Sequence, residues 1–254
     1  TPGSPESKEI REVIRKALIF VKYFKPDGEE YPHAIARGLK YLRAAVETEL
    51  QTSVQATLHL IAQSHIDVVW LWTRKETRRK CGRTFSTALS LLDEFPQLSF
   101  TQSQALLYEY LRQEYPHLFQ RVQQRVAEGR WETVGSMWVE PDCNLPNGES
   151  LVRQILTGKK FFRRHFGTES PVAWLPDTFG FNGALPQILK KAGIDYFFTT
   201  KLSWNDANPF PYHSFWWRGI DGTKILVHAP PLGLEATLSM RDLHHSWERY
   251  RQKE

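Results

Sequence analysis

The chain has 254 residues, of which 41% are hydrophobic and 24% charged, proportions that are ordinary for a soluble globular protein. Its net charge of +5 comes from scattered Lys and Arg side chains without an aromatic-interleaved basic stripe, which favours a solvated surface over nucleic-acid binding. No stretch is apolar for long enough to cross a membrane, so we expect neither a nucleic-acid nor a membrane partner.

The cysteine content and the modification signals indicate a cytoplasmic protein. Cys81 and Cys143 are the only two cysteines, which implies no disulfide framework and excludes a zinc site made of four thiolates. The sequence contains no Asn-x-Ser/Thr glycosylation site, and the polar residues 1–7 do not resemble a secretory signal peptide.

Residues 1–55 are predicted to form a helical segment. Ser4 and Pro5 form a helix-start signal, and apolar residues then recur at helical spacing to about Phe24. Residues 25–28 form a predicted turn, and a second helix is expected from about Pro32 to Leu50. We expect this pair of helices to provide packing surfaces and no chemistry.

Residues 56–254 are predicted to form an α/β domain, because strand and helix patterns alternate from Thr57 onward. The expected strands are 58–62, 98–101, 131–134, 171–175, 195–199, 215–217 and 224–228. The expected helices are 84–94, 104–112, 116–128, 148–166 and 184–192, and residues 241–254 are helix-like. This order indicates a largely parallel sheet, open or closed, and the first strand is expected to be buried on both faces.

Polar side chains follow the predicted strands, at the edge where functional groups of α/β folds collect. His65 and Asp67 follow the first strand, and Asp177 follows the fourth. The other members of this set are Glu140 and Asp142 after the third strand, and Lys201, Trp204, Asn205 and Asp206 after the fifth.

Three of these residues form a candidate metal site. His65 and Asp67 are two residues apart, so in extended backbone their side chains point the same way, and Asp177 is expected in the same layer. One imidazole and two carboxylates suit zinc or a related divalent ion better than calcium or magnesium, which prefer oxygen ligands alone. Trp70, close behind, offers an aromatic face for a sugar.

Several blocks of the sequence resemble family 38 glycoside hydrolases, the class II α-mannosidases, and most closely their cytosolic or bacterial type. The two signature blocks are 62–72 (AQSHIDVVWLW) and 174–182 (WLPDTFGFN). Further blocks that fit the family are 138–142, 148–151, 200–206 and 215–222, so the likeness extends from about Thr57 to about Pro231.

This resemblance implies a fold and an activity. We expect a seven-stranded-type, mostly parallel α/β barrel-like domain, complete or incomplete, that removes terminal α-linked mannose from oligosaccharides with retention of configuration. His65, Asp67 and Asp177 would bind one Zn²⁺, with Co²⁺ or another divalent ion as alternatives, and Asp177 would also be the nucleophile. Trp70, Phe179 and Lys201 would contact the substrate, and the full-length protein could form a homo-oligomer.

Two parts of the family's machinery have no counterpart in this chain. The general acid/base and a fourth ligand, a His, lie in later blocks of the family, and residues 241–254 do not resemble those blocks. His244 and His245 occupy a polar helical stretch, so we interpret them as surface residues. The chain is therefore expected to be an N-terminal portion of a longer enzyme, with little activity and weak zinc binding by itself.

Two other interpretations remain open. A metal-dependent polysaccharide deacetylase would use the ion to activate water and would form no covalent intermediate. A non-catalytic carbohydrate-binding module would explain the 13% aromatic content, and neither metal nor Asp177 would then matter for sugar affinity.

Overall fold

The computed structural model describes residues 5–48, 59–205, 207–208, 210–231, 233 and 238–250. The chain divides into two compact units, Thr1–Leu60 and Ile61–Glu254, which are treated separately below. The boundary at residues 55 and 56 that the sequence suggests stays a prediction. None of the described helices is both long and apolar enough to cross a membrane.

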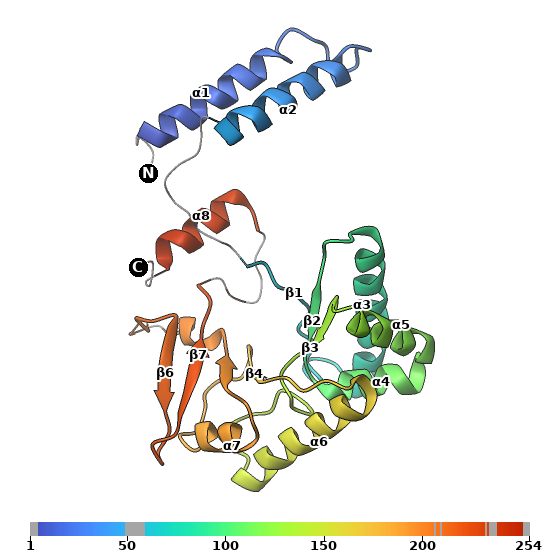
Figure 1. Cartoon of the computed structure of the whole chain (residues 1–254), viewed down its shortest axis with the longest axis vertical. Coiled ribbons are helices and arrows are strands. Elements are labelled where there is room, and N and C mark those ends of the chain that lie inside the picture. Colours follow the sequence, from blue (N-terminus) through green and yellow to red (C-terminus); the bar gives the residue numbers. More distant parts are fainter. Residues whose placement is uncertain are drawn as a thin grey trace. The chain divides into compact units, whose positions relative to one another are not determined.

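The first unit is a pair of helices, α1 (Pro5–Ile19) and α2 (Tyr31–Thr48) (Figure 1). Val13, Ala34 and Ala45 are buried. Other residues of the predicted packing faces are largely exposed, as Leu18 at 58% and Leu39 at 48% show. The first helix ends before Phe24, because the chain continues through short turns after Ile19.

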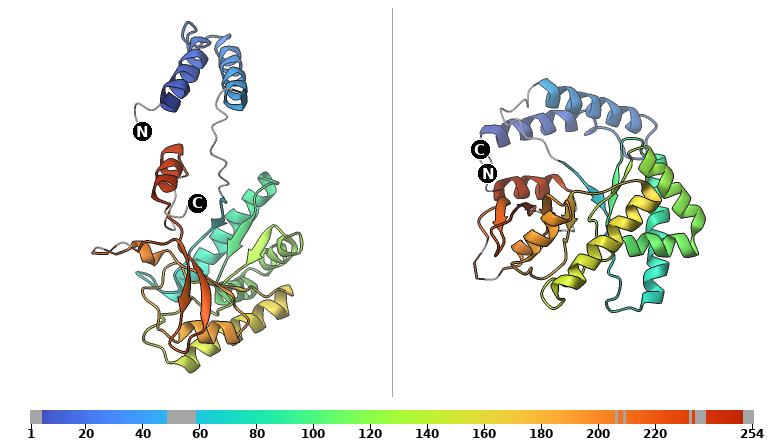
Figure 2. Two further views of the ribbon diagram at one scale, coloured as in Figure 1. Left: turned by 60° about the vertical axis from the view of Figure 1, so that its left-hand side comes forward. Right: turned by 60° about the horizontal axis from the view of Figure 1, so that its bottom comes forward.

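The second unit begins with a parallel three-stranded sheet in the order β1-β2-β3. Helices pack around it, with α3 and α5 visible beside the strands in Figures 1 and 2. Its elements are β1 (Ala62–Gln63), α3 (Arg74–Glu94), β2 (Phe100–Gln102), α4 (Ala105–Glu114), α5 (Pro116–Ala127) and β3 (Trp131–Thr133).

The core of this first sheet is rich in aromatic side chains. Trp131 and Tyr108 are almost completely buried, and Phe85 packs against both at centroid distances of 5.3 Å. The polar atoms of this cluster are paired, since Trp131 Nε1 donates to the Tyr108 hydroxyl (2.9 Å), which donates to the Gln102 carbonyl (2.8 Å). The cluster therefore buries large apolar area without leaving these donors unsatisfied.

A second sheet has the order β4-β5-β7-β6, in which β6 is antiparallel to β7 and the other pairs are parallel. The hairpin of β6 and β7 is seen clearly in Figure 2. The elements of this part are β4 (Val172–Trp174), α7 (Leu185–Lys191), β5 (Tyr196–Phe198), the 3₁₀ turn η1 (Lys201–Ser203), β6 (Ser214–Arg218), β7 (Lys224–His228) and α8 (Met240–Arg249).

Helix α6 (Gly148–Phe166) contributes to the cores of both sheets. Leu151 and Ile155 in its first half pack in the core of the second sheet, whereas Phe161 and Phe162 pack in the core of the first. The Asn147 side chain accepts a hydrogen bond from the Ser150 N–H at its start (2.9 Å), which satisfies one free donor of the first turn. The sequence predicts both the limits of this helix and its inward residues.

The structure corrects two expectations about the second unit. The first strand begins at Ala62, where pairing with β2 starts, so Leu60 and Ile61 precede the sheet and are more than half exposed instead of buried. Helix α3 begins at Arg74, ten residues before the expected start, because its charged first turns hide the apolar periodicity. The mixed α/β fold with a largely parallel sheet arrangement agrees with the expectation; the described residues form two open sheets, and the barrel itself stays a prediction.

Candidate active site

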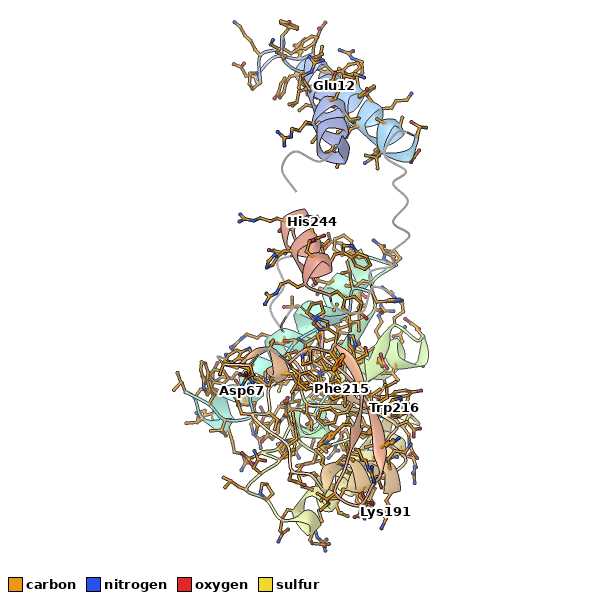
Figure 3. The ribbon with its side chains drawn as sticks, turned by 90° about the vertical axis from the view of Figure 1, so that its left-hand side faces the viewer. Glu12, Asp67, Lys191, Phe215, Trp216 and His244 are labelled. Atoms are coloured by element: carbon orange, nitrogen blue, oxygen red, sulfur yellow. The ribbon has the colours of Figure 1, made fainter. Side chains whose placement is uncertain are left out.

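The carboxyl ends of the parallel strands bring the predicted polar residues together. His65 and Asp67 follow β1, Asp177 follows β4 and Lys201 follows β5. Asp67 is labelled in Figure 3. The fold brings His65 and Asp67 next to Asp177, which lies 110 or more residues further along the chain, and it brings Lys201 next to Asp177 as well.

His65, Asp67 and Asp177 form a compact group of possible metal ligands. One ligand atom from each lies within 4.8 Å of the others. His65 Nε2 is 3.2 Å from Asp67 Oδ1 and 3.7 Å from Asp177 Oδ2. All three side chains are partly buried, with Asp67 and Asp177 each 32% exposed, so the group is reachable from solvent.

Lys201 holds the other oxygen of Asp177. Its Nζ lies 2.5 Å from Asp177 Oδ1, and its side chain is only 6% exposed. The ammonium group also lies over the rings of Phe179 (4.2 Å) and Trp204 (3.6 Å), which cover it. The Asp177 carboxylate is therefore fixed between a lysine on one side and an imidazole on the other.

Glu140, seven residues after the end of β3, holds the loop that contains Asp177 through hydrogen bonds to its backbone. Its Oε1 accepts hydrogen bonds from the N–H groups of Asp177 (2.5 Å) and Thr178 (2.8 Å) and from the Thr178 hydroxyl (3.1 Å). Burial raises the pKa of Glu140, although His65 and the Asp177 N–H act in the opposite direction. Its Oε2 lies 3.5 Å from His65 Nδ1.

Gln104, after β2, links the remaining segments of the site. Its side-chain amide donates to the Ile66 carbonyl (2.9 Å), and its carbonyl oxygen accepts from the Glu140 N–H (3.1 Å). The position of Gln104 directly after a strand is the sequence signal that identifies it, whereas the sequence pattern places Glu140 among the polar residues after the third strand but gives it no role. Neither residue type indicates a function without the neighbours that folding supplies.

A cavity of about 380 Å³, a volume typical of small-molecule sites, is lined by His65, Asp67, Gln104, Glu140 and Asp177, whereas Lys201 lies behind Asp177 and does not belong to the lining. Phe179 belongs to its lining and is 64% exposed, and Asp142 lines it too. The Asp142 carboxylate accepts from the N–H groups of Leu145 and Asn144, which hold its pKa below the ordinary value.

Trp70 is also 64% exposed and contacts Trp72 edge to face. Asp206 lies outside the described residues.

Comparison with known proteins identifies the family. Residues 55–254 match the glycosyl hydrolases family 38 N-terminal domain. The chain belongs to this family. The site residues described above all fall within the matched part, so the family resemblance seen in the sequence blocks is confirmed.

Relatives of this family 38 chain include two α-mannosidases. It is 43% identical over 205 residues to alpha-mannosidase G of Dictyostelium discoideum, covering 81% of this chain and 18% of that protein. It is 49% identical over 177 residues to human alpha-mannosidase 2C1, covering 70% of this chain and 17% of that protein. The chain thus spans less than a fifth of these relatives' length.

A solved structure shows the same fold. An α-mannosidase from Enterococcus faecalis V583 superposes on 74% of this chain and on 22% of its own with a TM-score of 0.62, at 22% sequence identity. This likeness extends to the arrangement of helices and strands and supports a shared family 38 fold.

The donor set fits one divalent cation. In tetrahedral zinc sites with bonds of 2.0–2.1 Å, neighbouring ligand atoms are about 3.3 Å apart. The separations of 3.2 and 3.7 Å around His65 Nε2 bracket this value. The carboxylates of Asp67, Asp177 and Glu140 all lie within 3.7 Å of the ring nitrogens of His65, so a cation would lower their mutual repulsion.

Proposed function

We propose that this chain carries the nucleophile and metal-binding half of a retaining α-mannosidase that releases terminal α-D-mannose from oligosaccharides. Its membership of family 38 and its identity of 43–49% to two α-mannosidases support this reaction. The observation that carries the proposal is the position of Asp177, whose carboxylate is fixed between Lys201 and His65 at the edge of an open cavity.

His65, Asp67 and Asp177 would hold the cation, zinc or a related divalent ion such as Co²⁺, which supplies Lewis-acid binding of the sugar hydroxyl groups. Both carboxylates and the imidazole are partly exposed toward the cavity, so a further ligand position can face the substrate. These three residues and the cation would together orient a terminal mannose relative to Asp177.

Asp177 would attack the anomeric carbon and form a covalent glycosyl–enzyme ester. The electron pair of the broken glycosidic bond leaves with the aglycone oxygen, which takes a proton from a general acid. Water then cleaves the ester and regenerates the Asp177 carboxylate. Lys201 keeps this carboxylate in one orientation through its 2.5 Å contact with Oδ1.

Phe179 and Trp70 would supply the apolar surface for the mannose ring. Phe179 lines the cavity and shields Lys201, and the largely exposed Trp70 is free to stack on a sugar. We assign the general acid and a fourth ligand to no residue of this chain, so we expect the chain alone to have low turnover. Three further expectations stay predictions: that the two sheets form part of a barrel, that the protein is cytoplasmic, and that the full-length protein forms a homo-oligomer.

The experiment that tests the nucleophile uses a fluorinated mannosyl substrate with an activated leaving group. Such a leaving group needs little protonation, so covalent labelling requires the nucleophile and not the general acid. We expect a mass increase of one glycosyl unit on Asp177, identified by peptide mass spectrometry. Asp177→Asn should abolish labelling, and turnover of an aryl α-mannoside by protein that contains the chain should fall more than about 10³-fold.

Asp195→Asn is the matched control, since Asp195 is an exposed aspartate paired with Lys190 away from the cavity. Absence of a label together with Asp177-dependent release of acetate from an acetylated saccharide would favour a deacetylase. Sugar binding that survives both Asp177→Asn and chelation would favour a binding module. Fast hydrolysis of an aryl α-mannoside by the chain alone would contradict the low turnover expected of it.

A further inference from the structure

The two ring nitrogens of His65 face different partners. Nε2 points to the carboxylates of Asp67 and Asp177, whereas Nδ1 lies 3.5 Å from Glu140 Oε2. A neutral imidazole has one nitrogen that can bind a cation, and the other carries the hydrogen. The group that accepts a hydrogen bond from Nδ1 therefore decides whether Nε2 is available as a ligand.

Glu140 is built into the fold in a way that suits this task. Its side chain is 7% exposed, and Oε1 is fully engaged by three donors from Asp177 and Thr178. Oε2 is a buried oxygen for which the described residues provide no hydrogen-bond partner at normal distance. A buried oxygen without a partner is costly, and the Nδ1–H of His65, whose nitrogen is 3.5 Å away, is a donor that could satisfy it.

Gln104 fixes the position of Glu140 relative to the His65 segment. It bonds the carbonyl of Ile66, which lies between His65 and Asp67, and it also accepts from the Glu140 N–H. Gln104 is 4% exposed and has a φ of 67°, a conformation that L side chains adopt rarely. Backbone strain of this kind persists where the surroundings hold it, and it concentrates at functional sites.

We propose that Glu140 is a positioning residue: Oε2 accepts the His65 Nδ1–H and leaves Nε2 free for a cation, while Oε1 holds the Asp177 loop. The inference rests on the metal-dependent function proposed above and extends it to the residue that sets the ligand's tautomer. One buried carboxylate thus links a ligand after β1 to the ligand and nucleophile after β4.

The direct test is the tautomer of His65 in the metal-free chain, read by ¹⁵N NMR. Asp67 Oδ1 is within hydrogen-bond distance of Nε2 (3.2 Å) and competes with Glu140 for the ring hydrogen, so we expect a mixture in which the Nδ1–H fraction is larger in the wild type than in Glu140→Gln. Glu140→Gln keeps the shape of the side chain and an oxygen for the Asp177 loop, but its amide can donate to Nδ1. The variant should therefore shift His65 toward the Nε2–H form, which a purely structural role of Glu140 does not predict.

The second readout is affinity for Co²⁺, followed by its visible absorption and by competition with a chelator. Loss of a residue that orients a metal-binding histidine commonly weakens affinity about 10–100-fold, and we expect this range for Glu140→Gln. Glu149→Gln is the matched control, because Glu149 is an exposed glutamate paired with Arg153. It should bind Co²⁺ as the wild type does.

The outcomes separate this inference from the proposed function. Equal tautomer populations in wild type and Glu140→Gln, or equal Co²⁺ affinities of the two, would overturn the role of Glu140. Failure of the metal site would look different: Co²⁺ would not bind, or Asp67→Asn would leave its binding unchanged. The tautomer shift between wild type and Glu140→Gln, which needs no metal, would then still decide the role of Glu140.

Discussion

The two sheets of the larger unit contribute to one site but are built differently. The sheet of β1, β2 and β3 is wholly parallel, is surrounded by helices and has an aromatic core, whereas the sheet of β4 to β7 has an antiparallel outer strand. Trp131 in the first is 2% exposed, but Trp216 on the outer strand is 64% exposed. Figure 3 labels Trp216 and its neighbour Phe215, whose side chain is partly buried.

The two sheets supply different residues of the site. The first sheet supplies His65, Asp67, Gln104 and Glu140, which are two of the three proposed cation ligands and the two residues that position them. The second sheet supplies Asp177 and Lys201. The hydrogen bonds from Asp177 and Thr178 to Glu140 connect the two, so the site depends on how precisely the sheets are joined.

The largest effect on stability is expected from Trp131→Ala. This change removes a buried aromatic side chain and leaves the Tyr108 hydroxyl without one of its partners, so it should lower the free energy of unfolding by about 3–5 kcal/mol. Urea-induced unfolding measures the loss. A loss below about 1 kcal/mol would mean that the first sheet is not the better-packed region.

A moderate effect is expected from Gly158→Ala in the middle of α6, where the helix passes from one core to the other. A methyl group there would lie 2.4 Å from the Ser136 carbonyl oxygen and 2.5 Å from the Met137 carbonyl carbon. Backbone cannot move aside cheaply, so we expect a loss of about 1–3 kcal/mol, with weaker Co²⁺ binding because the sheets shift relative to each other. Gly148→Ala, where a methyl group has room, is the control.

The smallest effect is expected from Trp216→Ala, which matches Trp131→Ala in chemistry but not in burial. Its side chain is largely exposed, so the free energy of unfolding should change by about 0.5 kcal/mol or less. The same urea titration measures it. A loss comparable to that of Trp131→Ala would show that the outer strand is covered in solution and would remove the contrast between the sheets.

Elements with strong hydrophobic periodicity and clear capping residues can be predicted from the amino-acid sequence alone. Helix α6 was predicted at its true limits, because its apolar residues repeat at helical spacing between Asn147 and Gly167. Polar residues collect after parallel strands, which predicts that His65, Asp67 and Asp177 lie close together, and the structure places them so. Lys201 was named as a substrate contact, and the structure adds its pairing with Asp177.

Burial and side-chain partners depend on contacts between distant parts of the chain, which the local sequence pattern does not encode. Leu60 and Ile61 read as a buried strand, but burial depends on what lies opposite, and sheet pairing begins only at Ala62. The start of α3 was missed because charged residues at Arg74 to Lys80 carry little periodicity. Glu140 and Gln104 acquire their roles only through partners 36 to 75 residues away, whose distances the folded chain alone sets.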